Sequence, residues 1–343
     1  MPQTFMNMKA IQFHKNSSED GSATDIELPL PKASGHDILV KIEAIAMNPV
    51  DYKVRPAEGD PPKTLGFDAA GTVVEVGDKV TLFQKGDQVY HAGDVTRPGT
   101  NAEFQLVDER IVAKRPTSLD ASTSAALPLT SLTAWESLFA RLGINPDTPE
   151  ENSGKSLLII GGAGGVGSIA IQLAKLAGLT VVATASRNES ADWCRNLGAD
   201  HIINHHEAMP PQLKNLGLET VDYIANFNDV DRVWEAMADM IAPQGSLVLI
   251  TGHQNQLNLG GTLKLKSARI CWEFMFTRSM YQTDDMIEQH HILTRVAKLV
   301  DDGKLIATAN DRLSPINAGN ILEGHRRLES GSTIGKLVLS GWE

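Results

Sequence analysis

Cysteine is the scarcest chemistry-bearing residue of this chain, and its scarcity restricts what the chain can do. Cys194 and Cys271 are the only two cysteines among 343 residues. One pair cannot build a disulfide framework or a four-cysteine zinc site. We interpret both as reduced residues that pack in the interior.

Long apolar runs and an excess of positive charge are also missing. No run approaches the length of about 18 apolar residues that a membrane span needs. The first ten residues, MPQTFMNMKA, hold no apolar stretch of signal-peptide length, so we expect a cytoplasmic protein with no membrane partner. The net charge of -11 opposes nucleic acid as a partner because both would carry negative charge. With 42% hydrophobic and 21% charged residues, the composition favours a globular chain of two ordinary domains.

The order of sequence patterns predicts an α/β fold in two parts. Residues 1–127 contain short apolar runs between glycine, proline and aspartate (38–47, 71–77, 86–90 and 102–107), which indicates an antiparallel, barrel-like domain. Residues 128–306 alternate strands with helices, which indicates a doubly wound parallel sheet with crossover helices. Its predicted strands are 156–160, 180–185, 201–203, 221–226, 246–251 and 269–276, with a helix over 283–300. A last strand at 335–339 has no helix after it and is expected to complete the first domain, within 307–343.

The most informative motif is a glycine turn between a predicted strand and a predicted helix. Its residues are Gly161, Gly162, Ala163, Gly164, Gly165, Val166 and Gly167. In a dinucleotide fingerprint, Gly162 permits the tight turn, Gly164 lets the backbone approach a pyrophosphate, and Gly167 lets the helix pack against the strand. The free N–H groups of the helix N-terminus would bind the phosphates. The competing interpretation is a glycine-rich surface turn.

The residues after the second strand of this part predict which nucleotide binds. NAD sites place an acidic residue there for the ribose 2′-hydroxyl. Here the strand is followed by Ser186, Arg187 and Asn188. A guanidinium can make forked hydrogen bonds to a 2′-phosphate, so we predict that NADP(H) is the cofactor. Alternatively, Arg187 is a solvated charge on a loop.

Further motifs run along most of the chain. They are Asn48-Pro49-Val50-Asp51, Gly66-Phe67-Asp68-Ala69-Ala70-Gly71, Gly86-Asp87-Gln88-Val89, Leu127-Pro128-Leu129-Thr130, Leu197-Gly198-Ala199-Asp200 and Gly335-Lys336-Leu337-Val338. Together with the glycine turn, they resemble the medium-chain dehydrogenase/reductase superfamily. Within it they resemble the quinone oxidoreductase (zeta-crystallin-like) branch, whose members are often catalogued as zinc-type alcohol dehydrogenase-like proteins. The resemblance implies a GroES-like catalytic domain and a Rossmann nucleotide-binding domain.

The resemblance also implies cofactor contacts. Positions near the nicotinamide or its neighbouring groups correspond to Thr130, Thr251, Gly252, Phe276 and Lys336. Two positions depart from many relatives, since Ser190 stands where a lysine meets the 2′-phosphate and His205 stands where a tyrosine lies beside the adenosine phosphate. Arg187 would then substitute for the lysine, and His205 could hydrogen-bond in place of the tyrosine.

The zinc-dependent branch of this superfamily needs metal ligands that this chain does not supply. Where that branch has a cysteine and a histidine, the chain has Asn48 and Phe67. The region of its third ligand reads Leu127-Pro128-Leu129-Thr130. Phenylalanine and leucine side chains cannot bind zinc, so no metal is expected.

Without a Lewis acid, an already electrophilic acceptor is the better substrate. The leading hypothesis is an NADPH-dependent, zinc-free reductase of a quinone or an α,β-unsaturated carbonyl, with aldehydes as further candidates. Asn48 and Tyr52 are the candidate catalytic residues, because both follow the strand that ends at Met47; Tyr52 is equally well explained as a packed aromatic. Asp51 and Asp68 are interpreted as loop braces. The alternatives are a zinc-type dehydrogenase with an atypical or lost metal site, and a non-catalytic NADPH-binding protein.

The apolar strand expected over 269–276 has a further consequence for assembly. It is the last strand of the predicted parallel sheet and would lie at its edge. Exposed strand edges favour pairing with another chain, so we expect a homodimer.

Overall fold

The computed structural model describes residues 6–342 and divides the chain into two compact units. The first unit extends to Leu132 and continues from Phe276, and the second unit is Thr133–Met275. The second unit is therefore shorter than the expected 128–306. Residues 276–306 fall in the first unit because their helix packs there: Tyr90 Oη donates to Leu293 O at 2.6 Å, and the His290 ring nitrogen lies 2.6 Å from Val112 O.

The first unit is built on a mixed, mostly antiparallel sheet in the order β14-β15-β3-β4-β5-β7, with β6 paired to β3 and with β1 and β2 forming a separate pair. The strands are β1 (Asn7–Phe13), β2 (Ala23–Pro29), β3 (Asp37–Ala46), β4 (Asp68–Val76), β5 (Gln88–His91), β6 (Phe104–Asp108), β7 (Val112–Lys114), β14 (Ala309–Leu313) and β15 (Lys336–Ser340). The predicted strands at 38–47, 71–77, 86–90 and 102–107 correspond to β3, β4, β5 and β6.

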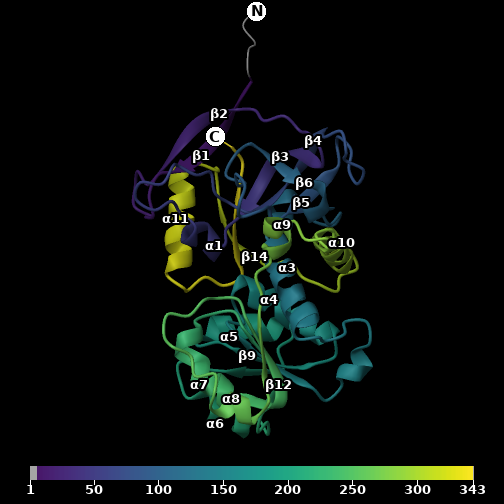
Figure 1. Cartoon of the computed structure of the whole chain (residues 1–343), viewed down its shortest axis with the longest axis vertical. Coiled ribbons are helices and arrows are strands. Elements are labelled where there is room, and N and C mark those ends of the chain that lie inside the picture. Colours follow the sequence, from purple (N-terminus) through teal and green to yellow (C-terminus); the bar gives the residue numbers. More distant parts are fainter. Residues whose placement is uncertain (1–5, 343) are drawn as a thin grey trace, which may run out of the picture. The chain divides into compact units, whose positions relative to one another are not determined.

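The helices of the first unit are α1 (Pro49–Lys53), α2 (Ala121–Ala125), α9 (Thr277–Tyr281), α10 (Glu288–Asp301) and α11 (Ala318–Glu329), with a 3-10 turn η1 (Glu109–Ile111). Three of them pack against its strands: α2 contacts β3 and β4, α10 contacts β7, and α11 contacts β2. α3 (Pro128–Trp135) begins in this unit. In Figure 1 the short α1 lies beside α11, in agreement with their packing contacts.

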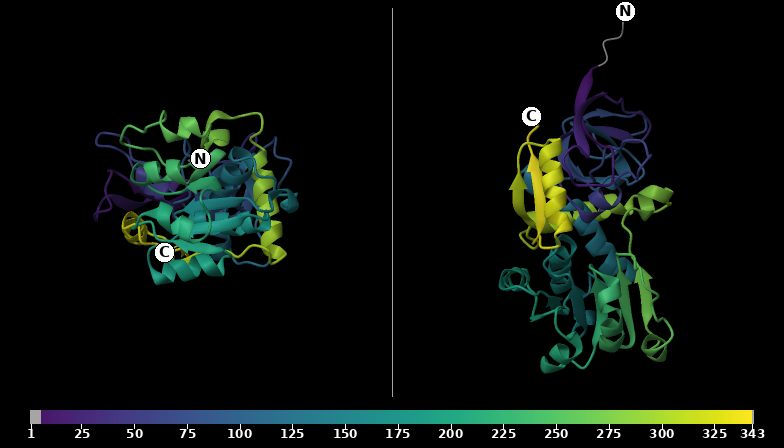
Figure 2. Two further views of the ribbon diagram at one scale, coloured as in Figure 1. Left: turned by 90° about the horizontal axis from the view of Figure 1, so that it is seen from below. Right: turned by 90° about the vertical axis from the view of Figure 1, so that its left-hand side faces the viewer.

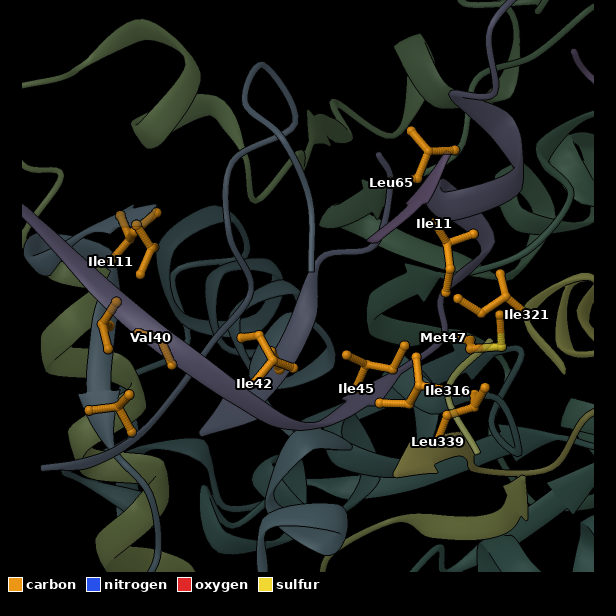
Figure 3. Close-up of a cluster of buried hydrophobic side chains, with 14 of the residues drawn as sticks. Ile11, Val40, Ile42, Ile45, Met47, Leu65, Ile111, Ile316, Ile321 and Leu339 are labelled. Atoms are coloured by element: carbon orange, nitrogen blue, oxygen red, sulfur yellow. The ribbon is translucent and has the colours of Figure 1, made fainter. Parts of the chain in front are cut away.

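An aliphatic cluster fills the interior of the first unit. Figure 3 shows Val40, Ile42 and Ile45 spaced along β3, where each is nearly or fully buried. Ile321 of α11 and Leu339 of β15 belong to the same cluster. Residues from both ends of the sequence thus share one core, and burial of each such side chain contributes about 1.5–3 kcal/mol.

The final strand, expected over 335–339, is β15 (Lys336–Ser340) and lies in the first unit. β15 pairs antiparallel with β3, with Val338 opposite Ala46. Met47 N donates to Leu337 O at 2.9 Å. Gly335 has φ +64, a left-handed conformation that glycine adopts without strain, directly before the strand begins. This pairing places Lys336 beside the end of β3.

The second unit is a parallel six-stranded sheet in the order β10-β9-β8-β11-β12-β13. This order, with the first strand central and the direction of winding reversed between β8 and β11, is the doubly wound Rossmann arrangement. Its strands are β8 (Ser156–Ile160), β9 (Thr180–Thr184), β10 (His201–Ile203), β11 (Val221–Asn226), β12 (Ile241–Leu249) and β13 (Arg269–Trp272).

Helices lie on both faces of this sheet (Figure 2). They are α4 (Gly165–Leu176), α5 (Asn188–Asn196), α6 (Met209–Asn215), α7 (Val230–Met240) and α8 (Thr262–Leu265), with the π-helix η2 (Glu136–Arg141) continuing α3 and a 3-10 turn η3 (Pro149–Asn152). The α/β fold expected from the sequence is confirmed.

Three elements differ by four or more residues from their predicted ranges, and one of them, β12, begins at Ile241, five residues before its predicted start. The strand expected over 269–276 stops at Trp272, because the Glu273 side chain turns to accept from Arg141 Nε at 2.7 Å and the chain then leaves the sheet. The helix expected from 283 begins at Glu288. Asp285, within the range expected for that helix, instead accepts from Arg278 Nε at 2.9 Å and from Thr283 Oγ1 at 2.7 Å in the preceding turn.

Across residues 6–342, no helix is both long enough and apolar enough to cross a membrane.

His91 makes the stability of the first unit sensitive to acid. The residue is fully buried, and neither ring nitrogen has a hydrogen-bond partner within the described chain. Burial lowers the pKa of His91 to about 3, whereas in the unfolded chain the ordinary pKa is about 6.5. The unfolded state therefore binds the proton first as the pH falls, and stability is lost from about pH 6.5 downward.

We expect the free energy of unfolding to fall by about 2 kcal/mol from this group between about pH 7 and about pH 5. His91→Leu should remove that part of the pH dependence. Urea unfolding of the two proteins at these pH values measures it. An equal pH slope in both proteins would contradict the prediction.

Candidate functional site

A buried polar cluster in the first unit joins three side chains that lie at the ends of three separate strands. Asn48 follows β3, Asp68 begins β4 and Lys336 begins β15. Their exposed fractions are only 1%, 0% and 3%. Asn48 Nδ2 donates to Asp68 Oδ2 at 2.9 Å, and Lys336 Nζ donates to the same oxygen at 2.9 Å and to Asn48 Oδ1. The three polar side chains therefore satisfy one another away from water.

Backbone groups complete the cluster. Lys336 Nζ donates to Met47 O at 2.7 Å, so each of its three N–H groups has an acceptor. Leu129 N, in the first turn of α3, donates to Asp68 Oδ1 at 2.7 Å. Asp68 thus braces the start of α3 as well as the two strands, in line with its predicted role as a brace.

The amide of Asn48 is fully used as a donor within this cluster. Its two hydrogens are directed to Ala46 O at 3.3 Å and to Asp68 Oδ2 at 2.9 Å. A substrate oxygen could accept from Asn48 only if one of these bonds broke. The second lone pair of Oδ1 and the fixed position of the side chain are what Asn48 offers to a bound molecule.

Asp51 lies in the first turn of α1, three residues after Asn48. Its Oδ2 accepts from Asn48 N at 2.7 Å, while Oδ1 is buried and has no partner in the described structure. Burial raises the pKa of Asp51 to about 7; the Asn48 N–H and Lys336 act in the opposite direction, and the negative charge of Asp68 adds to the rise. The sequence predicts only a bracing role for Asp51, whereas the structure shows a buried carboxyl group with one oxygen that has no partner among the described residues.

Tyr52 is half-buried on α1 and is part of a second group of polar side chains. The Arg55 guanidinium carbon lies 5.8 Å from the Tyr52 ring centroid, and the His325 ring meets Tyr52 edge-on at 6.5 Å. Arg55 donates to His325 Nδ1 at 3.3 Å and to Glu329 Oε1 at 2.8 Å. Burial and the charge of Glu329 raise the pKa of Tyr52, and Arg55 opposes them. The hydroxyl is therefore protonated near neutral pH and can donate.

Two predicted cofactor positions of the first unit have defined surroundings. Thr130 is buried in α3, where its hydroxyl lies 3.3 Å from Ala126 O and 3.2 Å from Leu127 O. Phe276 is the N-cap residue of α9, and its ring packs edge-on against the Phe67 ring, with the two ring centroids 5.1 Å apart.

The glycine turn of the second unit connects β8 to α4. Gly161 has φ +86, and its N–H donates to Thr184 Oγ1 at 3.0 Å. A Cβ on Gly167 would lie 2.2 Å from Gly161 O, so no larger residue fits there. A Cβ on Gly164 would meet nothing closer than Gly161 O at 3.5 Å, so the space over this residue is open. Those are the conditions that a phosphate-binding turn requires.

Ser186 and Arg187 lie between β9 and α5, and Asn188 is the first residue of α5. Arg187 is exposed and is the N-cap residue of α5. Ser190 is buried, and its hydroxyl accepts from Arg187 N at 3.2 Å and donates to Arg187 O at 2.9 Å. The Ser190 hydroxyl therefore caps the start of α5, and the Arg187 side chain supplies the positive charge of this loop.

His205 lies just beyond β10, close to the same edge of the sheet. Ala185 N donates to Ile203 O at 3.0 Å, which fixes the ends of β9 and β10 together. The His205 ring lies 4.5 Å from that of His206, whose Nδ1 is 2.7 Å from Arg232 Nη2. Burial and these two neighbours lower the pKa of His205, so it is neutral near pH 7.

Thr251 and Gly252 follow β12. Thr251 Oγ1 donates to Asn228 O, in the loop after β11, at 2.6 Å. A Cβ on Gly252 would have no other atom within 4 Å, so the backbone there is open to approach. Because all six strands are parallel, the predicted residues after β8, β9, β10 and β12 share the carboxyl edge of one sheet. Ligands of doubly wound sheets bind at that edge, where the winding reverses.

The residues at the metal positions do not fit zinc. The Phe67 ring is packed on Phe276, and Asn48 binds the Lys336 ammonium. No group of three or more histidine, cysteine, aspartate or glutamate side chains that could hold a metal occurs within residues 6–342. The oxygen atoms of the Asn48 cluster already hold a cation, and zinc prefers nitrogen and sulfur ligands.

Several residues of these clusters are not expected from the sequence. The grouping of Arg55, His325 and Glu329 behind Tyr52 joins residues that are 270 and 274 positions apart. Nothing local in the sequence indicates such a contact. Asp51 does carry a signal, because an acidic residue at the third position of a helix often bonds back to the N-cap residue.

Comparison with known proteins agrees with this architecture. Residues 34–117 match the model of the alcohol dehydrogenase GroES-like domain, and residues 165–289 match that of zinc-binding dehydrogenases. A zinc-type alcohol dehydrogenase-like protein of Staphylococcus epidermidis is 43% identical over 97% of this chain and 99% of its own. A 2-methylene-furan-3-one reductase of Solanum lycopersicum is 29% identical over 97% of this chain and 79% of its own. The solved structure of a proposed zinc-dependent alcohol dehydrogenase of Rhizobium etli is 46% identical, with a TM-score of 0.93 over 99% of both chains.

A GroES-like domain joined to a Rossmann domain, with a glycine turn at the switch point, defines a class of oxidoreductases. The chain belongs to the medium-chain dehydrogenase/reductase superfamily, in the branch that contains zinc-type alcohol dehydrogenase-like proteins and quinone oxidoreductases.

Proposed function

We propose that the protein is an NADPH-dependent, zinc-free reductase that transfers hydride to a quinone or an α,β-unsaturated carbonyl. The Asn48–Asp68–Lys336 cluster carries this proposal, because it puts an ammonium and a neutral amide where a metal-dependent relative would hold a Lewis acid. Such a site cannot polarise an unactivated alcohol strongly. An acceptor that is already electrophilic needs only orientation, exclusion of water and hydrogen bonds to its developing negative charge.

Two sets of residues would hold the cofactor. In the second unit they are Gly162, Ala163, Gly164, Gly165, Val166, Gly167, Ser186, Arg187, Asn188, His205, Thr251 and Gly252. In the first unit they are Thr130, Phe276 and Lys336. Bound NADPH would supply the hydride. The open backbone at Gly164 and the N-terminus of α4 suit the pyrophosphate, and the exposed Arg187 suits the 2′-phosphate.

Asn48 and Tyr52 are assigned different tasks toward the acceptor. Tyr52 is the candidate proton donor, since its raised pKa keeps the hydroxyl protonated near neutral pH. Asn48 has both amide hydrogens engaged, so it would contribute a fixed polar surface through Oδ1. The similarity to a 2-methylene-furan-3-one reductase, whose named substrate is a conjugated ketone, favours enones in the first assay.

The test follows NADPH oxidation by chelator-treated protein, with quinones, enones, alkenals and saturated aldehydes as acceptors. Turnover with quinones or conjugated carbonyls, and none with saturated aldehydes, is the expected result. Turnover that disappears on chelation and returns with zinc would favour a zinc-type dehydrogenase instead. NADPH binding by folded protein, with no turnover on any acceptor, would favour a non-catalytic binding protein.

Arg187→Ala is expected to raise KM for NADPH about 10-fold and to leave KM for NADH within about 2-fold, because only NADPH carries the phosphate that the guanidinium would bind. Arg195→Ala is a matched control, since Arg195 is an exposed arginine of the adjoining α5, paired with Asp192 at 2.7 Å. An equal change in both KM values, or none, would remove Arg187 from the cofactor site.

The proposed assembly is a homodimer formed through β13. This strand is at the edge of the second unit's sheet, and Trp272 and Phe274 are 50% and 46% exposed there. An unpaired edge beside exposed aromatic rings favours pairing with a second copy. A solution mass equal to the single-chain 37.1 kDa would contradict the proposal.

A further inference from the structure

The ammonium group of Lys336 is buried where β3, β4 and β15 meet, and its burial requires a physical explanation. Lys336 is only 3% exposed, and lysine is rarely placed so deep unless it is paired. Its three acceptors are a backbone carbonyl (Met47 O), an amide oxygen (Asn48 Oδ1) and a carboxylate oxygen (Asp68 Oδ2). These are three oxygen ligands around one cation, which is how a protein binds a hard metal ion.

We propose that the Lys336 ammonium is a built-in cation that takes the place of a metal ion in this site. The ammonium donates hydrogen bonds to both Asn48 and Asp68. Its positive charge repels a divalent cation from the same oxygen atoms. The inference deepens the proposed zinc-free reaction and rests on it.

The charges of the cluster support this role. Lys336 and Asp68 together are neutral, and both are engaged by further hydrogen bonds. A divalent ion placed among the same oxygen atoms would face the ammonium with only one carboxylate to offset it. Removing the ammonium, by contrast, leaves a buried carboxylate beside two uncharged oxygen ligands. Such a set of oxygen atoms is suited to a small alkylammonium or a hard cation rather than to zinc.

Lys336→Ala tests the inference by thermal unfolding. We expect Tm to fall by about 5–10 °C, because a buried charge loses its partner. Methylammonium, or a hard divalent cation such as Mg²⁺ or Mn²⁺, should recover part of that loss. Lys304→Ala removes an exposed lysine of the same unit, and neither it nor the wild type should respond to these cations.

A pH measurement separates a cation role from a merely structural one. The groups that act on Asp51 are the Asn48 N–H and Arg55 from its own segment, Asp68 from β4 and Lys336 from β15. Lys336 is among those that lower the pKa of Asp51, so its removal should move the midpoint of the pH dependence of Tm upward. Methylammonium should move the midpoint back.

Two results would overturn the inference. One is a Lys336→Ala protein whose Tm responds to neither methylammonium nor divalent cations. The other is wild-type protein that is purified with one zinc per chain, measured by elemental analysis after growth in zinc, and that loses stability on chelation. If Lys336→Ala does not fold, Lys336→Met combined with Asp68→Asn, which removes both charges, should fold and be more stable than Lys336→Met alone. Because the readouts are Tm and metal content, failure of NADPH turnover would count against the proposed function and not against the built-in cation.

Discussion

Asp51→Asn is expected to stabilise the protein by about 2–4 kcal/mol near pH 8. Most replacements of a buried, hydrogen-bonded residue destabilise. Here the carboxyl group has one accepted hydrogen bond, from Asn48 N, and one buried oxygen with no partner within the described residues. Asparagine keeps the acceptor and carries no charge.

The sign follows from the two pKa values. The pKa of Asp51 is raised from 3.8 to about 7 in the folded protein. Between these values the unfolded chain releases its proton while the folded chain must keep it, so the wild type loses stability as the pH rises from about 4 to about 7. Above about 7 the loss stays constant. The gain from Asp51→Asn should therefore be small near pH 4 and complete near pH 8.

Chemical denaturation of both proteins across this pH range measures the effect. Asp60→Asn is a suitable control, because Asp60 is exposed and also accepts one backbone N–H, from Ala57 at 3.0 Å. A variant that is less stable than the wild type at every pH would show that Asp51 is held as a carboxylate. A variant that is more stable but has lower kcat would indicate that the buried acid serves the reaction.

Gly164→Ala and Gly167→Ala are expected to have large and different effects, although they lie three residues apart. A methyl group on Gly164 meets only ordinary contact, 3.5 Å from Gly161 O, so the fold should accept it. The same methyl would occupy the space through which a pyrophosphate approaches the backbone. We expect Kd for NADPH to rise about 10- to 100-fold with Tm nearly unchanged, since each factor of 10 in Kd is about 1.4 kcal/mol.

Gly167→Ala should instead damage the fold itself. Its methyl would lie 2.2 Å from Gly161 O and 2.7 Å from Gly162 O, and backbone atoms cannot move aside cheaply. The expected loss of stability is about 1–3 kcal/mol, with weaker NADPH binding as a consequence. Tm and fluorescence titration with NADPH on both variants distinguish the two cases. Unchanged NADPH affinity in Gly164→Ala would mean that this turn does not hold the pyrophosphate.

The parallel sheet is predictable in part because its central strand β8 is a short apolar run that is buried along its whole length. β8, β10 and β11 have the predicted ranges. The range predicted for β13 is too long, because nothing local shows that Glu273 pairs with Arg141, 132 residues away. α11 is not predicted, although its apolar face is part of the first unit's core.

The sequence displays the residues of the candidate site, but it does not show which hydrogen bonds they form or how their pKa values shift. Asn48, Asp68 and Lys336 all lie in motifs that the sequence displays. Their mutual bonds depend on pairing across 268 and 288 residues, which only the folded sheet provides. The raised pKa of Asp51 has no sequence signal either, because it arises mainly from burial and not from a neighbour in the chain.

The return of the last strand also sets an order for folding during synthesis. Residues 133–275 are contiguous and leave the ribosome as a complete unit, whereas the first unit needs residues 276–343 to finish its sheet and core. The N-terminal part of the first unit, which is synthesised first, can therefore complete its fold only after the C-terminal residues have been synthesised. Until β15 arrives, Asp68 lacks its cation, and the edge of β3 that pairs with β15 stays open. A ribosome stalled before residue 336 would hold a folded second unit beside an unfinished first one.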